Sequence, residues 1–193
     1  FSECCPVVQK KILEKYKLRL QMEQTACNCG PNDSNSNQYF ETVKIAKTKN
    51  ICPMCEDFAK DKADNQTPIA ILSCEGACLR GEVSRRAANL ICFSLMPEQT
   101  ARICLGGAFT KDGGQRNLVR NASRVIALEG CYINFASRMM SGVVEGLAPE
   151  VIIVDKLYSF DKKLFGINEV REEEFVEFSK TAAAKIVQMI SNK

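Results

Sequence analysis

Short apolar segments alternate with amphipathic patterns over the last two thirds of the chain, and this alternation is what most constrains its fold. Four apolar segments have the length of buried strands: residues 69–73, 101–105, 125–128 and 151–154. Residues at helical spacing fill the intervals between them, and a last helical pattern covers 172–190. The strands begin roughly 24–32 residues apart, a fair length for a right-handed βαβ unit. The sequence therefore predicts an α/β fold with a Rossmann-like open sheet, mostly parallel.

The first third of the chain has a different pattern. We expect a cysteine-rich N-terminal segment, residues 1–67, to precede an α/β domain, residues 68–193. Within the segment the sequence predicts an amphipathic helix over 7–22, an exposed polar loop over 28–37, a strand over 39–46 and a helix over 52–62. Pro53 suits the first turn of that last helix, where its missing N–H costs nothing.

Cysteines close three of the predicted strands, each beside a glycine-containing turn: Cys74, Cys104 and Cys131. The carboxyl ends of parallel strands meet at one edge of a sheet, where ligands collect. We therefore expect three thiols at this edge, with Cys78 as a natural fourth member. Four thiolates would form a tetrahedral zinc site. If Cys78 points away, three thiolates leave an open position that suits a catalytic zinc or a [4Fe–4S] cluster.

Other readings of these positions stay open. Cysteine is also a small side chain that is often buried, and we interpret Cys92, inside a helical pattern, as part of the core. Glu75 and Glu129 lie next to strand-end cysteines, where they could move protons. We expect such carboxylates on exposed turns to be solvated.

Histidine is absent from the chain, whereas cysteine occurs eleven times. An odd number of thiols cannot all pair within one chain, and the α/β pattern is not that of a small disulfide-rich secreted domain. Catalysis by serine–histidine or cysteine–histidine pairs is excluded. Any transition-metal site must use thiolates, with carboxylates or water as supplements.

Charge and hydropathy argue against two classes of partner. The net charge is +3, and basic residues alternate with acidic ones, so we expect no nucleic-acid partner. No apolar run approaches the roughly 20 residues that span a bilayer, so we expect no membrane partner. The start of the chain does not resemble a signal peptide, and the cytoplasm is the expected location.

The N-terminal segment holds six further cysteines. Cys27 with Cys29, and Cys52 with Cys55, resemble two halves of a four-thiolate metal knuckle. Alternatively, Cys52 and Cys55 form a redox pair at a helix start, like the glutaredoxin motif. The adjacent Cys4 and Cys5 are either a site for capturing soft metals or a reactive chain end.

The run from Ile69 to about Val154 resembles the DGC-domain family, whose cysteines are proposed to bind zinc. The matching pieces, in order and at matching spacing, are 73–76, 81–88, 104–107 and the namesake motif at 129–131. The resemblance implies that Cys74, Cys104 and Cys131 are metal ligands. Glu129 replaces the aspartate of the motif, and Phe135 stands where the family usually has another cysteine. Cys78, from the loop after the first strand, is the replacement that we consider.

These observations predict a metal-binding protein whose ligand is a metal ion, with zinc as the first choice, acting in metal or metalloid handling or sensing. The site is expected at the carboxyl edge of the sheet and comprises Cys74, Cys78, Cys104 and Cys131. The alternative is a thiol-redox or iron–sulfur enzyme that uses an open cluster position.

Overall fold

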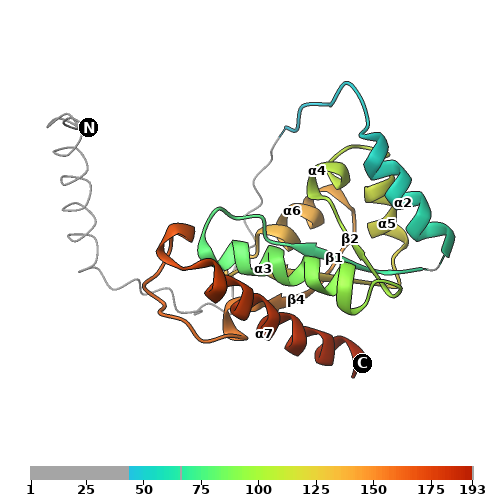
Figure 1. Ribbon diagram of the computed structural model, residues 1–193. Helices are drawn as coiled ribbons and strands as arrows, with labels where there is room; N and C mark the ends of the chain where they lie inside the picture. The colour runs from blue at the N-terminus through green and yellow to red at the C-terminus, as the bar shows by residue number, and fades with distance from the viewer. Residues whose placement is uncertain (1–43, 66, 193) are drawn as a thin grey trace, which may run out of the picture. The chain divides into compact units, whose positions relative to one another are not determined.

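The computed structural model describes residues 44–65 and 67–192, and its centre is a four-stranded parallel sheet (Figure 1). The strands are β1 (Ile69–Ser73), β2 (Thr100–Arg102), β3 (Arg124–Glu129) and β4 (Glu150–Ile153). Their order is β2-β1-β3-β4, and each neighbouring pair is parallel. The predicted α/β fold with an open parallel sheet is confirmed.

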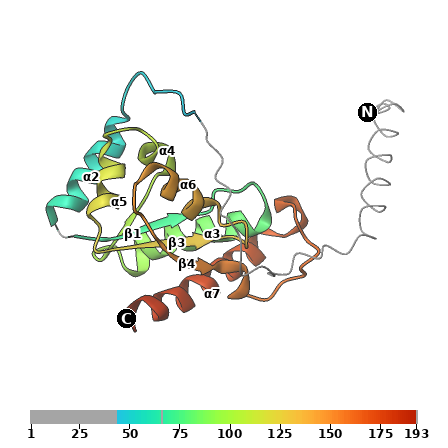
Figure 2. The same cartoon turned by 180° about the vertical axis from the view of Figure 1, so that it is seen from behind.

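Helices cover both faces of this sheet, as the two opposite views show (Figures 1 and 2). Their bounds are α2 (Pro53–Asn65), α3 (Leu79–Leu90), α4 (Leu105–Ala108), α5 (Gly114–Asn121), α6 (Phe135–Val143) and α7 (Glu172–Ser191). A π-helical turn (Ile91–Leu95) extends α3, and short 3₁₀ turns lie at Val154–Lys156 and Ile167–Glu169. Helices α3 and α7 pack together on one face, and α2, α4, α5 and α6 lie on the other.

The strands are apolar on both sides because each face of the sheet has its own core. In β1, Ile71 packs in the core beneath α3 and α7, whereas Ala70 and Leu72 pack in the core beneath the other helices. Successive side chains of a strand point to opposite faces, so a strand covered on both faces needs a continuous apolar run. That requirement explains why residues 69–73 lack the polar alternation of a half-exposed strand.

Helix α2 belongs to the same compact unit as the sheet, which comprises Ile45–Lys193. Its Ala59 is buried in the core beneath α5, although it precedes the boundary expected at residue 67. The strand predicted over 39–46 does not form where the structure describes it, since residues 44–48 have no regular structure. The helix predicted over 7–22 and the loop over 28–37 lie outside the described residues.

The connections make a switch point between β1 and β3. After β1 the chain passes through α3 on one face of the sheet and reaches β2, which pairs with β1. After β3 it passes through α6 on the opposite face and reaches β4, which pairs with β3. Chain segments that leave neighbouring strands in opposite directions open a crevice at their carboxyl ends. Cys74 and Cys131 follow these two strands. No described helix is both long and apolar enough to span a bilayer.

Candidate functional site

Cys74, Cys78 and Cys131, which we call the switch-point thiols, follow the carboxyl ends of β1 and β3, the place that we call the crevice. The Cys74 side chain is 7% exposed, and its sulfur accepts the backbone N–H of Gly76 at 3.4 Å. A Cβ atom at Gly76 would lie 3.3 Å from the Cys74 sulfur and 4.0 Å from the Cys78 sulfur. Cys131 is an electrostatic neighbour of Cys74. Cys74 and Cys78 therefore lie on either side of the turn that contains Gly76, and Cys131 lies near Cys74.

The position of Cys78 is set by contacts from the far end of the chain. Cys78 precedes α3 and forms an isolated antiparallel bridge with Gly166, while the next amide, of Leu79, donates to the carbonyl of Phe165 at 2.8 Å. The Cys78 thiol is half-buried and is an electrostatic neighbour of the buried Tyr158 hydroxyl. Within the described part of the chain this hydroxyl has no hydrogen-bond partner, and burial raises the pKa of Tyr158 above its usual value.

The Glu129-Gly130-Cys131 motif shapes the other side of the crevice. Glu129 is fully buried, and its carboxylate accepts the amides of Ala136 and Ser137 at 3.2 and 2.7 Å and the Ser137 hydroxyl at 2.8 Å. It thus caps the start of α6 and is not solvated, contrary to our expectation. Gly130 lets α3 approach, since a Cβ there would lie 2.8 Å from the backbone carbonyl of Arg80. The turn then presents the half-buried Cys131.

Glu75 behaves differently from Glu129. Its carboxylate forms an ion pair with Arg102 and accepts the Ser73 hydroxyl at 2.9 Å. Arg102 in turn donates to the Ser73 hydroxyl at 2.6 Å. This network joins the ends of β1 and β2 beside the thiols, so Glu75 is held by an ion pair at the edge of the sheet.

Cys52, Cys55 and Cys104, which we call the α2–β2 thiols, form a second group. Cys104 follows β2, is exposed, and accepts the amide of Gly107 at 3.4 Å. The Cys55 sulfur would lie 3.6 Å from a Cβ at the same Gly107. The thiols of Cys52 and Cys104 both influence the ionisation of the Cys55 thiol. Cysteines some fifty positions apart in the sequence are thus brought together.

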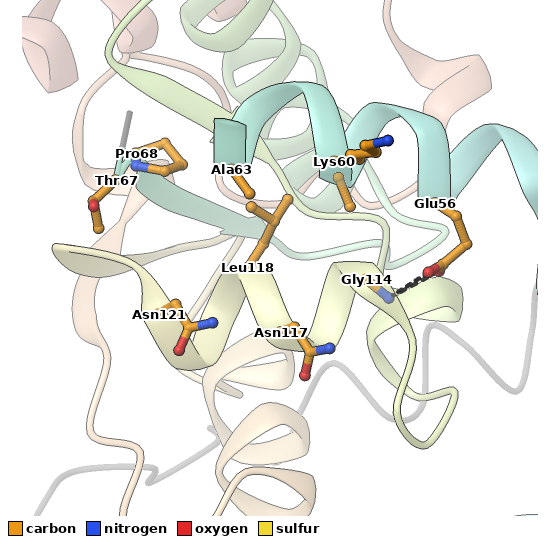
Figure 3. A pocket seen from close by; sticks show the side chains of 10 residues that line it. Glu56, Lys60, Ala63, Thr67, Pro68, Gly114, Asn117, Leu118 and Asn121 are labelled. Carbon is orange, nitrogen blue, oxygen red and sulfur yellow. Dashed lines mark hydrogen bonds between the residues drawn. The ribbon is translucent and has the colours of Figure 1, made fainter. Parts of the chain in front are cut away.

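Two polar side chains hold α2 against the turn after β2. The buried Gln115 amide accepts the Cys104 N–H at 3.0 Å and donates to the Cys55 carbonyl at 3.3 Å. Both carboxylate oxygens of Glu56 accept the Gly114 N–H, at 2.8 and 2.9 Å, at the start of α5. Figure 3 shows this last contact at the end of a pocket of about 330 Å³, with Leu118 pointing toward α2.

The environments of the thiols differ in ways that matter for their chemistry. The backbone N–H of Cys55, followed by its thiol, lowers the pKa of the exposed Cys52. Burial, followed by the neighbouring thiols of Cys52 and Cys104, raises the pKa of Cys55 to about 12. Burial also raises the pKa of Cys74, and it raises that of Cys92 to about 11. Cys92 is 2% exposed in the core, as predicted.

A cleft of about 560 Å³ adjoins the α2–β2 thiols and is lined by Cys55 and Cys104. Its apolar wall includes Met54, Phe58 and Phe93, and the last two rings meet edge to face at 6.4 Å. Sequence reasoning missed this cleft because the residues that line it come from α2, α3 and the turn after β2, which no local pattern connects.

Six of the predicted site cysteines lie within the described residues, together with the core residue Cys92. The described cysteines are free thiols: Cys52, Cys55, Cys74, Cys78, Cys92, Cys104 and Cys131. Among residues 44–65 and 67–192, no group of three or more cysteine, aspartate or glutamate side chains is arranged to hold a metal ion. The four-thiolate zinc site stays a prediction. Cys4, Cys5, Cys27 and Cys29 lie outside the described residues, so their predicted metal sites are untested.

Comparison with known proteins supports the resemblance seen in the sequence. The model of the DGC domain matches residues 70–186, which include all of the sheet except Ile69, both motifs that flank the crevice and most of α7. No curated protein and no solved structure matches the chain. The match covers more than half of the chain, and the chain therefore belongs to the DGC domain family.

Proposed function

We propose that this protein binds a thiophilic metal ion, zinc in the first instance, at the crevice between β1 and β3. The observation that carries the proposal is that Cys74 and Cys78 both lie at the turn of Gly76, with Cys131 as an electrostatic neighbour of Cys74. Sulfur is the donor that zinc and other soft metals prefer. Backbone N–H groups directed at sulfur stabilise a thiolate, and Cys74 accepts such a bond from Gly76.

The donor chemistry fits zinc, but the side chains are not arranged around an ion in the described part of the chain. Binding therefore requires them to draw together with Cys104, the other strand-end cysteine of the four-thiolate set predicted from the sequence. Two buried oxygens near the crevice lack hydrogen-bond partners among the described residues, the Tyr158 hydroxyl and the Asn134 side-chain carbonyl. Tyr158 is an electrostatic neighbour of Cys78, and the Asn134 N–H donates to the Cys131 carbonyl at 3.3 Å, so both residues lie close to the proposed ligands. When bound, zinc would supply a fixed positive charge that holds the thiols deprotonated.

The role that we propose is metal or metalloid handling or sensing in the cytoplasm. A reducing compartment suits a protein whose described cysteines are all free. Contacts within the chain position the three thiols. Glu129 caps α6, Gly130 allows α3 to pack closely, and residues 165–166 hold the loop at Cys78.

Metal content and the visible spectrum of protein purified without air test this proposal. We expect colourless protein with stoichiometric zinc, and we expect Cys74→Ser and Cys131→Ser each to abolish stoichiometric loading. Cys92→Ala is the matched control, because Cys92 lies in the core away from the crevice and should leave loading unchanged. Cys104→Ser tests in the same way whether Cys104 is a ligand.

Two results would count against the assignment. Broad visible absorption from thiolate-bound iron would replace zinc with an iron–sulfur cluster. Full zinc loading in both Cys74→Ser and Cys131→Ser would show that the crevice is not the site.

A further inference from the structure

The α2–β2 thiols form a second group of neighbours, of which the proposed metal site would use Cys104 alone. Cys55 neighbours both of the others: its N–H donates to the Cys52 carbonyl at 3.1 Å, and its sulfur and that of Cys104 both lie beside Gly107 in the lining of one cleft. Cys52 is exposed at the start of α2, Cys55 is half-buried, and Cys104 is exposed beside the cleft. The two outer thiols are therefore more accessible to solvent than Cys55, and Cys55 can form a disulfide with either of them.

In the described ranges, no set of three cysteine, aspartate or glutamate side chains is arranged to hold a metal ion, and this holds for both groups of thiols. The α2–β2 thiols differ from the switch-point thiols in that one of them, Cys55, neighbours both of the others. Thiols in a row instead allow a disulfide to form at one pair and move to the next, since each exchange needs only the attack of one sulfur on its neighbour. Cys52 and Cys55 also have the Cys-x-x-Cys spacing that permits a disulfide within one helical turn.

We propose that Cys52, Cys55 and Cys104 form a thiol–disulfide exchange site that reduces a small disulfide compound. The Cys52 thiolate attacks one sulfur of the compound, its S–S bond breaks, and the first thiolate leaves. Cys55 gives its proton to water and attacks the Cys52 sulfur, which releases the second thiolate and forms the Cys52–Cys55 disulfide. The protein loses two electrons and the compound gains them. Attack of Cys104 on Cys55 then yields a Cys55–Cys104 disulfide and frees Cys52.

The cleft beside these thiols supports a small substrate. Its volume of about 560 Å³ lies within the range of small-molecule sites. Cys55 and Cys104 line it together with the exposed Met54 and Phe93, so a bound molecule would contact both sulfur atoms and an apolar wall. A folded partner domain could not enter a space of this size, although an exposed disulfide loop could approach Cys52 from solvent.

Gln115 is the positioning residue for the second exchange. Its side-chain amide links the Cys55 carbonyl to the Cys104 N–H and is almost fully buried, so it fixes the separation of α2 from the turn after β2. The Cys52–Cys55 pair lies within one segment and does not need this link. Loss of the amide should therefore slow the formation of the Cys55–Cys104 disulfide and leave the Cys52–Cys55 disulfide unaffected.

The experiment is a time course of the reduced, full-length protein with oxidised glutathione and a metal chelator, quenched in acid and mapped by tryptic mass spectrometry. Cys52 and Cys55 fall in peptide 50–60, Cys104 in peptide 103–111, and Cys74 and Cys78 in peptide 63–80. We expect an internal disulfide in peptide 50–60 to form before any in peptide 63–80, followed by a cross-link between 50–60 and 103–111.

Three variants sharpen the result. Cys55→Ser should trap glutathione on Cys52. Gln115→Met should slow the cross-link by about tenfold, because orientation governs the rate, while the internal disulfide forms at the normal rate and reports an intact α2. Cys92→Ala should behave like the unchanged protein.

The proposal is overturned if the first disulfide forms in peptide 63–80, if Cys104 never links to Cys55, or if Gln115→Met slows both disulfides equally. It does not depend on metal binding: zinc loading lost in Cys74→Ser but intact in Cys52→Ser and Cys55→Ser would separate the two functions. Failure of zinc binding at the crevice would leave the disulfide map unchanged.

Discussion

At the scale of single residues, the Glu129-Gly130-Cys131 motif divides three tasks among three neighbours. The Glu129 carboxylate caps α6 through two backbone amides and a hydroxyl. Gly130 has no side chain because the backbone of α3 lies against it. Cys131 alone carries a group that can react or bind metal. Two of the three motif residues thus serve to place the third.

Gly130 provides a prediction at this scale. In Gly130→Ala, the new Cβ would lie 2.8 Å from backbone atoms of Arg80 and 2.9 Å from the Gly81 nitrogen, so the α3 backbone must shift. We expect the free energy of unfolding to fall by about 1–3 kcal/mol, the usual cost of overpacking. Urea denaturation measures the change.

Gly142 is the matched control. It lies in α6 with nothing within 4 Å of its added Cβ, so Gly142→Ala should raise the free energy of unfolding by about 0.5–1 kcal/mol through helix propensity. A Gly130→Ala protein as stable as the unchanged one would contradict the close packing of α3 on this motif.

At the scale of elements, helix α2 shows what a local pattern can and cannot predict. Its existence follows from Pro53 in the first turn and from the helical spacing after it, and the helix forms at Pro53–Asn65. Its partner could not be predicted, because the Glu56 carboxylate caps a helix 58 residues away in the sequence. The grouping of Cys55 with Cys104 depends on the same docking. The sequence therefore placed Cys104 in the strand-end set without its nearer neighbour in α2.

The docking of α2 is testable through Glu56. In Glu56→Ala, the Gly114 amide at the start of α5 loses its carboxylate acceptor, and α2 keeps the bond from Lys62 to the Pro97 carbonyl but loses this charged contact with α5. We expect amide hydrogen exchange to accelerate in 53–65 while the amides of β1 stay protected. Mass spectrometry of peptide fragments follows both regions at once.

Asp57→Ala is the control for that experiment, because Asp57 is the exposed carboxylate next along the same helix. It should leave exchange in α2 unchanged. Equal acceleration in both variants would indicate a general effect of charge on α2 and not a loss of docking.

At the scale of the whole molecule, the strand order decides which predicted residues meet. The sequence predicted β1 at its observed bounds, since a strand buried on both faces is a continuous apolar run. It predicted the shared carboxyl edge as well, because parallel strands require it. The order β2-β1-β3-β4 was not readable, because each crossover is compatible with either side of β1. That order brings Cys74 and Cys131 to the switch point. The burial of Glu129 was also missed, since its acceptors lie in a helix that had not yet been placed.

Two buried groups that can lose a proton, the Cys92 thiol and the Tyr158 hydroxyl, make the free energy of unfolding depend on pH in the alkaline range. Burial raises the pKa of Cys92 from 9.0 to about 11, and burial likewise raises the pKa of Tyr158. A group whose pKa is higher in the folded state stabilises the fold below its unfolded pKa, and this contribution is lost as the pH rises through the folded value. We expect the free energy of unfolding to be constant up to about pH 9 and to fall by about 2–3 kcal/mol for Cys92 alone at about pH 11.

Urea denaturation at a series of pH values measures this slope. Cys92→Ala should be less stable at neutral pH, because it loses a buried sulfur, but should have the shallower slope above pH 9. The two proteins are compared in the same buffers, so the other groups that titrate in this range contribute equally to both. Parallel slopes would mean that the Cys92 thiol ionises in the folded core as readily as in the unfolded chain, which its 2% exposure argues against.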